Sequence, residues 1–487
     1  MTSSTKKRVA QIRQGQVPKG YRLTRCGIVP GDWTESCLGD IYTERNEPGN
    51  ENLPLLMVSI HSGVSDGEVD EEQLPKKVKR IADKTQYKRA ASGDLVFNMM
   101  RAWQGAIGTV RTEGMVSPAY IVAVPNDKVD PLFMDYYVKM ERTIQYIHRQ
   151  SYGVTDFRLR LYWDSFISIP CVLPPLTEQR KIAKILAAQD KVIELKKKLL
   201  EETKRRKKAL VRMLMESTGL KRLEAASPRG AAHRGEAASC RFVGTQWRKV
   251  KLGDLFSFGN GYTPSTVSRE YWDGGTIPWF RMEDIRANGR ILKDSIQHVT
   301  PKAVKKTGLF PAGSFILSTT ATIGEYALLI ADSLANQRFT FLIKNVNRSS
   351  EVDTMYFLQY LAVISKWCKK TANAGGLLAV NIDDLSAYEF LLPPLAIQRQ
   401  IAAILSAADR EIDLLRQNLE QEERKKKALM QLLLTGIVRV RGVESGVGKR
   451  HLAAYKSGNE AAGSRFSTGI VKRSGRYHIS DEEKSHG

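Results

Sequence analysis

Cysteine is scarce in this chain of 487 residues, and so is histidine. The five cysteines are odd in number, widely separated and never in CxxC spacing, so the sequence indicates neither a disulfide framework nor a zinc site. The seven histidines form no HxH or HExxH arrangement, which leaves no metal site to predict. We therefore expect free thiols, and no cofactor held by this chain.

Long apolar runs and acidic residues are also in short supply. No apolar run approaches the roughly 18 residues that span a bilayer, and the opening residues lack the apolar centre of a signal peptide, so we expect a cytoplasmic protein. Lys and Arg number 75 against 52 Asp and Glu, a formal net charge of +23. Such an excess is typical of a protein with a polyanionic partner, with nucleic acid ahead of an anionic membrane surface.

The chain contains one internal repeat. LPPLTEQRKIAKIL (173–186) and LPPLAIQRQIAAIL (392–405) share ten of fourteen residues at an offset of 219. The same offset joins RRKKALVRMLM (205–215) to RKKKALMQLLL (424–434), and such a constant offset indicates a rigid element. Seven-residue steps, typical of a coiled-coil seam, connect Leu186, Ile193, Leu200, Lys207 and Leu214 in one copy, and Leu405, Ile412, Leu419, Lys426 and Leu433 in the other. We predict two long helices, each reaching roughly 60 Å, that pair antiparallel.

A segment of about 150 residues precedes each helix, and the two segments share turn and strand signals in the same order. Strands are predicted at 92–98 and 119–124 in the first segment and at 312–318 and 338–343 in the second, with helices near 132–148 and 354–368. The predicted fold is therefore α/β, two mixed α/β domains joined by two long antiparallel coiled-coil helices with pseudo-twofold symmetry. Its parts are a flexible extension (1–19), a first domain (20–172), a long helix (173–216), a linker (217–240), a second domain (241–391), a second long helix (392–436) and a disordered basic tail (437–487).

Five stretches of the sequence resemble a known family. They are GYRLTRCGIVPGDW (20–33), YWDGGTIPWFRMEDI (271–285), the two LPPL segments and LLLTGIVRV (432–440), and together they look like the specificity subunit of type I restriction-modification systems. The resemblance implies two target recognition domains, each reading one half of an asymmetric bipartite site in double-stranded DNA. It further implies two modification (methyltransferase) subunits that use S-adenosylmethionine, and restriction subunits that use ATP and Mg, as partners.

In that family the paired helices set the spacer between half-sites and dock the modification subunits. The residues that the resemblance assigns to these spacer helices are Gln179, Arg180, Ile182, Leu186, Ile193, Leu200 and Leu214, with Gln398, Arg399, Ile401, Leu405, Ile412, Leu419 and Leu433 in the second copy. The chain departs from the family at Ile397, where the family usually has the Glu seen at Glu178. Basic clusters at 196–198, 204–208 and 423–427 are predicted to be a solvated helix face, with DNA phosphate contact or partner docking as the alternatives.

No catalytic machinery is recognisable. GVESGVGK (442–449) has five residues between its outer glycines where a phosphate loop has four, and the Glu-Leu-Lys at 194–196 lacks the upstream Pro-Asp of a nuclease signature. We therefore predict a chain that is not an enzyme and leaves catalysis to its partners. Two other classes stay open, namely a stand-alone two-headed DNA-binding regulator and a structural scaffold.

Base contacts are expected from loops that follow strands, because Arg suits guanine and Asn or Gln suits adenine. The leading stretches are NMMRAWQG (98–105) and STTATIG (318–324). The predicted DNA-binding residues are Arg101, Trp103, Gln104, Thr319 and Thr320, followed by Arg45, Asn46, His61, Arg281, Asn336, Gln337 and Arg338.

Overall fold

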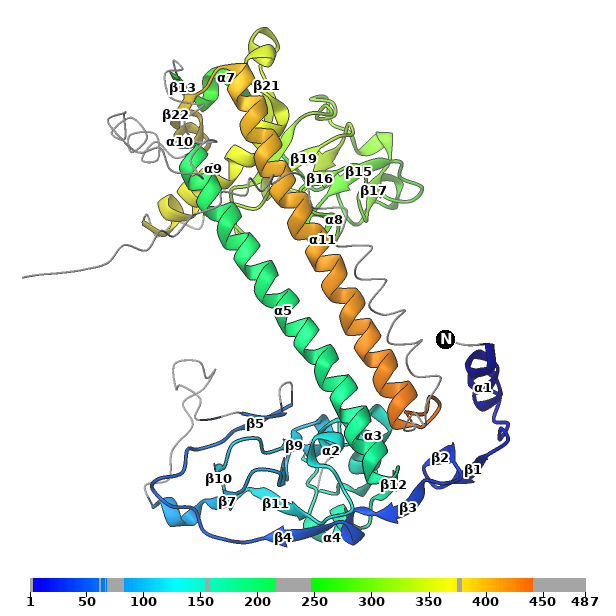
Figure 1. The fold of residues 1–487 in the computed structure, drawn as a ribbon. Helices are drawn as coiled ribbons and strands as arrows, with labels where there is room; N and C mark the ends of the chain where they lie inside the picture. The colour runs from blue at the N-terminus through cyan, green and yellow to red at the C-terminus, as the bar shows by residue number, and fades with distance from the viewer. Residues whose placement is uncertain are drawn as a thin grey trace, which may run out of the picture. The chain divides into compact units, whose positions relative to one another are not determined.

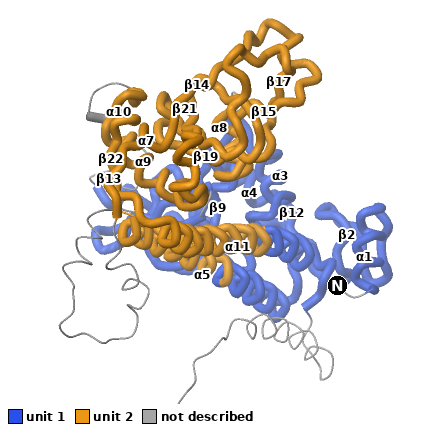
Figure 2. The backbone as a smooth tube through the Cα atoms, turned by 90° about the horizontal axis from the view of Figure 1, so that it is seen from above, with its two compact units in different colours: residues 1–191, 424–487 blue, residues 192–423 orange. Residues whose placement is uncertain are grey.

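The chain divides into two compact units in a computed structural model that describes residues 3–60, 63–65, 67, 83–153, 158–215, 247–374 and 379–440. Unit 1 comprises residues 1–191 and 424–487, and unit 2 comprises residues 192–423 (Figure 2). The boundaries cut both long helices, α5 (Leu176–Met215) and α11 (Leu395–Leu434), which are 40 residues each. Each unit therefore combines one α/β domain with a segment of both helices (Figure 1).

Unit 1 is built around a four-stranded sheet of order β4-β11-β8-β9. The unit also contains the two-stranded pairs β1-β2, β3-β12, β5-β6 and β7-β10. The strands are β1 (Tyr21–Thr24), β2 (Gly27–Pro30), β3 (Thr34–Cys37), β4 (Tyr42–Arg45), β5 (Val58–Ser59), β6 (Gly63–Val64), β7 (Lys88–Ala90), β8 (Leu95–Asn98), β9 (Ile107–Thr109), β10 (Gly114–Val116), β11 (Tyr120–Pro125) and β12 (Pro170–Leu173). The helices are α1 (Ser3–Arg13), α2 (Pro131–Tyr137), α3 (Glu141–Gln150) and α4 (Trp163–Ile167).

Unit 2 has a five-stranded sheet of order β14-β21-β18-β19-β16 and a three-stranded sheet of order β17-β15-β20. A further pair joins β13 to β22. The strands are β13 (Arg248–Lys251), β14 (Phe256–Asn260), β15 (Ile277–Phe280), β16 (Ile291–Leu292), β17 (His298–Val299), β18 (Phe315–Ser318), β19 (Tyr326–Leu329), β20 (Leu334–Ala335), β21 (Phe339–Lys344) and β22 (Glu389–Leu392). The helices are α7 (Leu252–Leu255), α8 (Met282–Asn288), α9 (Thr354–Ala374) and α10 (Ile382–Ser386).

The four predicted strands are confirmed as β8, β11, β18 and β21. Each unit pairs its two strands antiparallel, with Phe97 opposite Ile121 in unit 1 and Ile316 opposite Phe341 in unit 2. These apolar strands are buried on both faces, since β8 and β18 are covered on either side by helices or by the smaller sheets. The mixed α/β character predicted for both domains is thus confirmed.

The predicted seam packs the two helices antiparallel inside each unit. In unit 1, Leu186 of α5 and Leu433 of α11 belong to one buried core. In unit 2, Leu214 of α5 and Leu405 of α11 belong to another. Each domain core is therefore completed by the start of the helix that follows it and by the end of the other copy's helix.

Three local predictions need correction. Residues 3–13, expected to be flexible, form helix α1, whose Arg8 donates a hydrogen bond to the carbonyl oxygen of Ile437 at 2.9 Å. The single helix expected near 132–148 is two helices, because Val138 caps α2 and Met140 begins a new helix with extended backbone. Residues 437–440, expected to begin the disordered tail, are also ordered, since the backbone N–H of Val438 donates to the carbonyl oxygen of Leu432 at 2.9 Å. The linker, the tail beyond Val440 and the stretch 442–449 lie outside the described residues.

Neither a membrane-spanning helix nor a metal-ion cluster is found in the described ranges. None of the helices there combines the length and apolar character that crossing a bilayer requires. No cluster of three or more His, Cys, Asp or Glu side chains that could hold a metal ion occurs in that part of the chain.

Candidate nucleic-acid interface

In unit 2, a parallel strand pair brings predicted DNA-binding residues together. Strands β15 and β20 run parallel, with Phe280 opposite Ala335. The carboxyl ends of parallel strands meet at one edge, so Arg281 and Asn336, which follow them, become neighbours. The backbone N–H of Asn336 donates to the carbonyl oxygen of Phe280 at 3.0 Å. Residues 55 positions apart in the sequence thus share one edge.

A tight turn then presents Gln337 and Arg338 to solvent. The Asn336 side-chain oxygen accepts a hydrogen bond from the backbone N–H of Arg338 at 3.1 Å. This turn packs against Gly261, where an added Cβ would lie 2.2 Å from the Asn336 carbonyl oxygen. Gln337 accepts a hydrogen bond from the Thr263 hydroxyl. Both Gln337 and Arg338 are exposed, and the Arg338 guanidinium has no partner among the described residues.

The loop after β18 lies beside this turn. The backbone N–H of Thr319 donates to the carbonyl oxygen of Arg338 at 3.1 Å, and its hydroxyl pairs with that of Thr340 at 3.0 Å. Thr319 is only 6% exposed, so the prediction that it contacts DNA is corrected: its polar atoms hold the framework. Thr320 is half-buried and stays a candidate.

The same loop carries a strained backbone. Ala321 has φ 58°, and no other non-glycine residue in the described ranges has a positive φ. Such outliers concentrate at functional sites, where the surrounding structure enforces them. The strain supports the choice of 318–324 as a contact loop.

In unit 1 the predicted loop 98–105 presents two polar side chains. Asn98 accepts a hydrogen bond from the backbone N–H of Met100 at 2.9 Å, which turns the chain after β8. Trp103 donates its indole N–H to the carbonyl oxygen of Met100 at 3.0 Å and packs edge-on against His148. Arg101 and Gln104 remain exposed, whereas Trp103 shapes the loop.

The second-rank candidates of unit 1 separate into three cases. Arg45 is bound to Asp94 at 2.8 Å and to Glu47, and its side chain is 15% exposed. These contacts, with the Asp94 hydrogen bond the strongest, raise the pKa of Arg45 and make it a framework residue rather than the DNA contact predicted. Asn46 is exposed, and His61 lies outside the described residues.

Two glutamines assigned to the docking helices instead anchor each helix to its own domain. The backbone N–H of Asp130 donates to Gln179 at 2.8 Å, and Gln179 donates to the carbonyl oxygens of Lys128 and Pro174 at 3.0 and 2.9 Å. Gln398 repeats this pattern with Asp353 at 2.8 Å and with the carbonyl oxygens of Glu351 and Pro393 at 2.8 and 2.9 Å. Both glutamines are 1% exposed, so a partner subunit cannot reach them in this conformation.

The remaining spacer-helix residues divide by exposure. Arg180 and Arg399 lie 4.0 Å from Asp130 and Asp353 with mostly exposed side chains, so docking stays a prediction for them. Leu419 is half-buried. The others are buried in their own unit and form the helix seam instead of an outer docking face: Ile182, Leu186, Ile193, Leu200, Leu214, Ile401, Leu405, Ile412 and Leu433.

Sequence reasoning missed the apolar residues that do face outward. Leu195, Leu199 and Leu414 of unit 2 are 53%, 48% and 59% exposed on the long helices. Leu195 and Leu414 are related by the offset of 219, so the repeat preserves an exposed leucine at this position. The signal was available, because they are apolar helical positions outside the seven-residue seam.

Glu178 ties the segment after α11 to the start of the chain in unit 1. Arg439 donates to Glu178 at 2.7 Å and to both oxygens of Asp32 at 2.7 and 2.8 Å. Trp33 and the backbone N–H of Val440 also donate to Glu178, at 3.3 and 3.0 Å. Burial would raise the pKa of Glu178, but these hydrogen bonds outweigh it and lower the pKa below its ordinary value.

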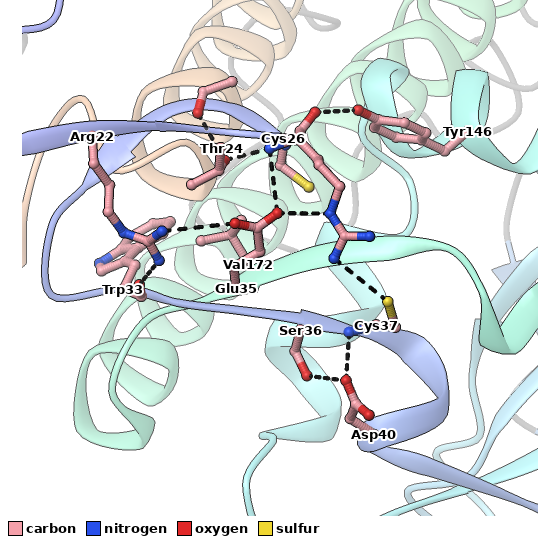
Figure 3. A network of polar contacts seen from close by, with 12 residues as sticks. Arg22, Thr24, Cys26, Trp33, Glu35, Ser36, Cys37, Asp40, Tyr146 and Val172 are labelled. Carbon is pink, nitrogen blue, oxygen red and sulfur yellow. Dashed lines mark hydrogen bonds and ion pairs between the residues drawn. The ribbon is translucent and has the colours of Figure 1, made fainter.

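The motif around residues 20–33 forms the other side of this anchor (Figure 3). Arg25 binds Glu35 at 2.9 Å, and Arg22 donates to the carbonyl oxygen of Trp33 at 2.8 Å. These contacts fix the β1–β2 hairpin beside Trp33. Tyr21 then donates its hydroxyl to the carbonyl oxygen of Gly436 at 2.8 Å. The family-like residues of 20–33 and 432–440 thus meet in one network.

Two α/β domains with duplicated helix anchors and different exposed loops define a class of protein whose two halves share one framework. Residues 245–424 match the family model described as the type I restriction modification DNA specificity domain. The specificity subunit of type I restriction enzyme EcoprrI from Escherichia coli is 41% identical over 172 residues, 34% of this chain and 42% of that protein. That alignment spans less than half of the relative's length.

Other relatives extend over most of the chain. The putative type I restriction enzyme MjaX specificity subunit from Methanocaldococcus jannaschii is 25% identical over 454 residues, 87% of this chain and 97% of that one. A solved chain from work on complex assembly and conformational transition of the type I R-M system has a TM-score of 0.51 at 18% identity, covers 84% of this chain and 99% of its own, and shows a shared fold. The resemblance drawn from the sequence is confirmed: residues 245–424 match the type I DNA specificity domain, and the relatives named above are type I restriction enzyme specificity subunits.

Proposed function

We propose that this chain selects the DNA target of a type I restriction-modification complex. The domain within 20–172 reads one half of an asymmetric bipartite site and the domain within 241–391 reads the other. The observation that carries this proposal is that the two units share their helix anchors but differ in the side chains that their loops expose. Gln179 and Gln398 make the same three contacts in both units, whereas the exposed side chains differ, Arg101 and Gln104 in one and Gln337 and Arg338 in the other.

The proposal includes partners that supply the chemistry. Two modification subunits would bring S-adenosylmethionine, and restriction subunits would bring ATP and Mg, at a cytoplasmic location. The exposed Leu195 and Leu414 support docking on the long helices, because repeat-related apolar residues in solvent favour burial against another protein. The net charge of +23 supports contact with DNA phosphates, which weakens as salt rises.

Methylation tests the function directly. Expressed with its modification partner, the chain should direct adenine methylation to one bipartite motif, read by sequencing methylated genomic DNA. Exchanging residues 20–172 for the matching domain of another family member should change one half-site and leave the other intact, because each unit holds its own core. The chain alone is the control and should methylate nothing. Methyl transfer by the chain alone, or a simultaneous change of both half-sites, would contradict the proposal.

Base reading is testable at Arg338. Arg338→Ala should reduce discrimination in one half-site by about 10- to 100-fold, since a good bidentate contact is worth about 1–3 kcal/mol. The matched control is Arg286→Ala, an exposed arginine on α8 of the same unit. If Arg286 binds only a phosphate, its removal should weaken binding evenly across sequences. Competition binding of the assembled complex to single-base variants gives the result, and unchanged discrimination in Arg338→Ala would remove Arg338 from the interface.

A further inference from the structure

A three-residue polar contact joins α2, α5 and α11 within unit 1. Asp190 of α5 accepts a hydrogen bond from the hydroxyl of Tyr136 at 2.7 Å and forms an ion pair with Lys426 of α11 at 2.6 Å. Lys426 also lies 5.5 Å from the centre of the Tyr136 ring. One carboxylate therefore holds both the domain helix and the opposing long helix.

Unit 2 contains the repeat-related contact. Asp409 of α11 accepts a hydrogen bond from Gln359 of α9 at 2.8 Å and forms an ion pair with Lys207 of α5. Asp190 and Asp409 are 219 positions apart, and so are Lys207 and Lys426. The domain partner changes from Tyr136 to Gln359, yet the carboxylate and the lysine are kept.

Three other ion pairs between the two helices do not follow the repeat, and one of them joins Arg206 to Glu411, whose counterparts are Lys425 and Val192. Lys196 pairs with Glu422 at 3.0 Å, but their counterparts at the offset of 219 are Leu415 and Thr203. Lys197 pairs with Glu423 at 3.0 Å, while the counterparts Arg416 and Lys204 carry like charges. Unlike these pairs, the Asp–Lys pair is present in both copies.

Both lysines sit where the seam would otherwise be apolar. Lys207 and Lys426 occupy the seven-residue steps between leucines, and the Lys207 side chain is 13% exposed. A charge at a seam position lowers stability but selects one alignment of the helices. In both pairs the residue numbers add to 616, since 190 faces 426 and 207 faces 409, so both pairs satisfy one antiparallel register.

A slip of one helix along the other by one heptad would separate both aspartates from their lysine partners. Lys207 would then face Ala402 or Arg416. Asp190 would face Leu419 or Leu433. After a slip in either direction, two of the four remaining seam steps would still join leucines or isoleucines, against three of five in the present register. The apolar seam by itself therefore favours the present register only weakly.

We propose that Asp190 with Lys426 and Asp409 with Lys207 are the positioning residues that select one register of α5 and α11, and thereby one spacer length between the two half-sites. Tyr136 hydrogen-bonds to Asp190 and Gln359 hydrogen-bonds to Asp409, so each domain is attached to one of the two ion pairs. The register of the helices therefore fixes where each domain is held along them. The inference rests on the proposed function and adds to it which residues fix the spacer.

The decisive variant neutralises both lysines while keeping their length and apolar stems. Lys207→Met with Lys426→Met should fold and melt within a few degrees of wild type, because methionine suits a seam position. With the modification partner it should methylate sites of more than one spacer length. A one-heptad slip moves the helices by about 10 Å, or roughly three base pairs. Wild type should show a single spacer.

Charge exchange supplies the second measurement. Lys207→Asp alone should lower the melting temperature of the full chain and broaden the spacer distribution, and adding Asp409→Lys should restore both. The matched control is Lys198→Asp, whose ion pair at 2.6 Å lies within α5 and reports nothing about register.

The possible outcomes distinguish a failure of the register proposal from a failure of the proposed function. A single unchanged spacer in the double-methionine variant, or no recovery on charge exchange, would overturn the register proposal. Absence of methylation in wild type itself would instead count against the proposed function. The melting measurement needs neither DNA nor partner, so recovery of stability on charge exchange supports the pairing independently.

Discussion

Arg439→Ala should lower the free energy of unfolding of unit 1 by about 3 kcal/mol, because removing one partner of a buried ion pair strands the other charge. The side chains of Arg439 and Glu178 are 13% and 4% exposed, so water cannot take the place of the guanidinium. Hydrogen–deuterium exchange of the β3 and β12 amides in increasing denaturant would measure the loss of stability. Arg439→Lys should recover only part of it, since an ammonium cannot bridge two carboxylates as a guanidinium does.

The matched control is Arg416→Ala on α11. Its ion pair with Asp413 at 3.3 Å has side chains 56% and 63% exposed, so its removal should cost less than about 1 kcal/mol. Equal protection of β3 and β12 in Arg439→Ala and wild type would show that the segment 435–440 is not needed to hold unit 1 together.

Acid should erase the difference between Arg439→Ala and wild type. The folded pKa of Glu178 is lowered, so its contribution is fully present above the ordinary value of 4.5 and disappears as pH falls through the folded pKa. The stability gap should therefore be constant near neutral pH and shrink below about 4.5. A gap that persisted at lower pH would instead assign the lost stability to the Arg439 guanidinium, which lies over the Trp33 ring at 5.8 Å from its centre.

The second large expected result concerns the distance between half-sites. Seventeen positions separate Asp190 from Lys207 in α5, and seventeen separate Asp409 from Lys426 in α11. Four residues added near Leu200 and four near Leu419 would lengthen both helices alike and keep both ion pairs in register. Four residues add about 6 Å with a rotation of only some 40°, which corresponds to one or two base pairs. We expect unchanged half-sites and a longer spacer in the methylated motif.

The insertion near Leu200 alone is the informative comparison. It changes one interval and not the other, so one Asp–Lys pair must break, and we expect a lower melting temperature than for the paired insertion. An active paired variant that retained the original spacer would show that helix length does not set the distance. A changed half-site would show that the helices also influence base reading.

The sequence predicted the helices and strands well, because the spacing of apolar residues and the internal repeat can be recognised without knowing the fold. Seven-residue steps identified the seam, and the offset of 219 gave both helices to within three residues at each end. Alternating or continuous apolar character placed β8, β11, β18 and β21 correctly. Lys207 and Lys426 were visible as interruptions of the seam, but their carboxylate partners lie on the opposite helix and depend on the register.

The candidate site was predicted less completely, because residue type does not reveal the partner that a side chain finds in the fold. Arg45 has the residue type of a DNA contact, but it binds Asp94, which lies 49 positions further along the sequence. Thr319 lies in the right loop, yet its hydroxyl meets Thr340. Arg281 and Asn336 become neighbours only through the parallel pairing of β15 and β20, which no local pattern indicates.

The packing of residues 433–439 against the first domain also has a consequence during synthesis. The core of unit 2 is complete once Leu405 has left the ribosome, because its last member is that residue. The core of unit 1 includes Leu433 and Leu434, and its polar anchor needs Arg439. The domain translated first is therefore the last to finish folding, and a frameshift after residue 423 would damage the N-terminal domain while leaving unit 2 whole.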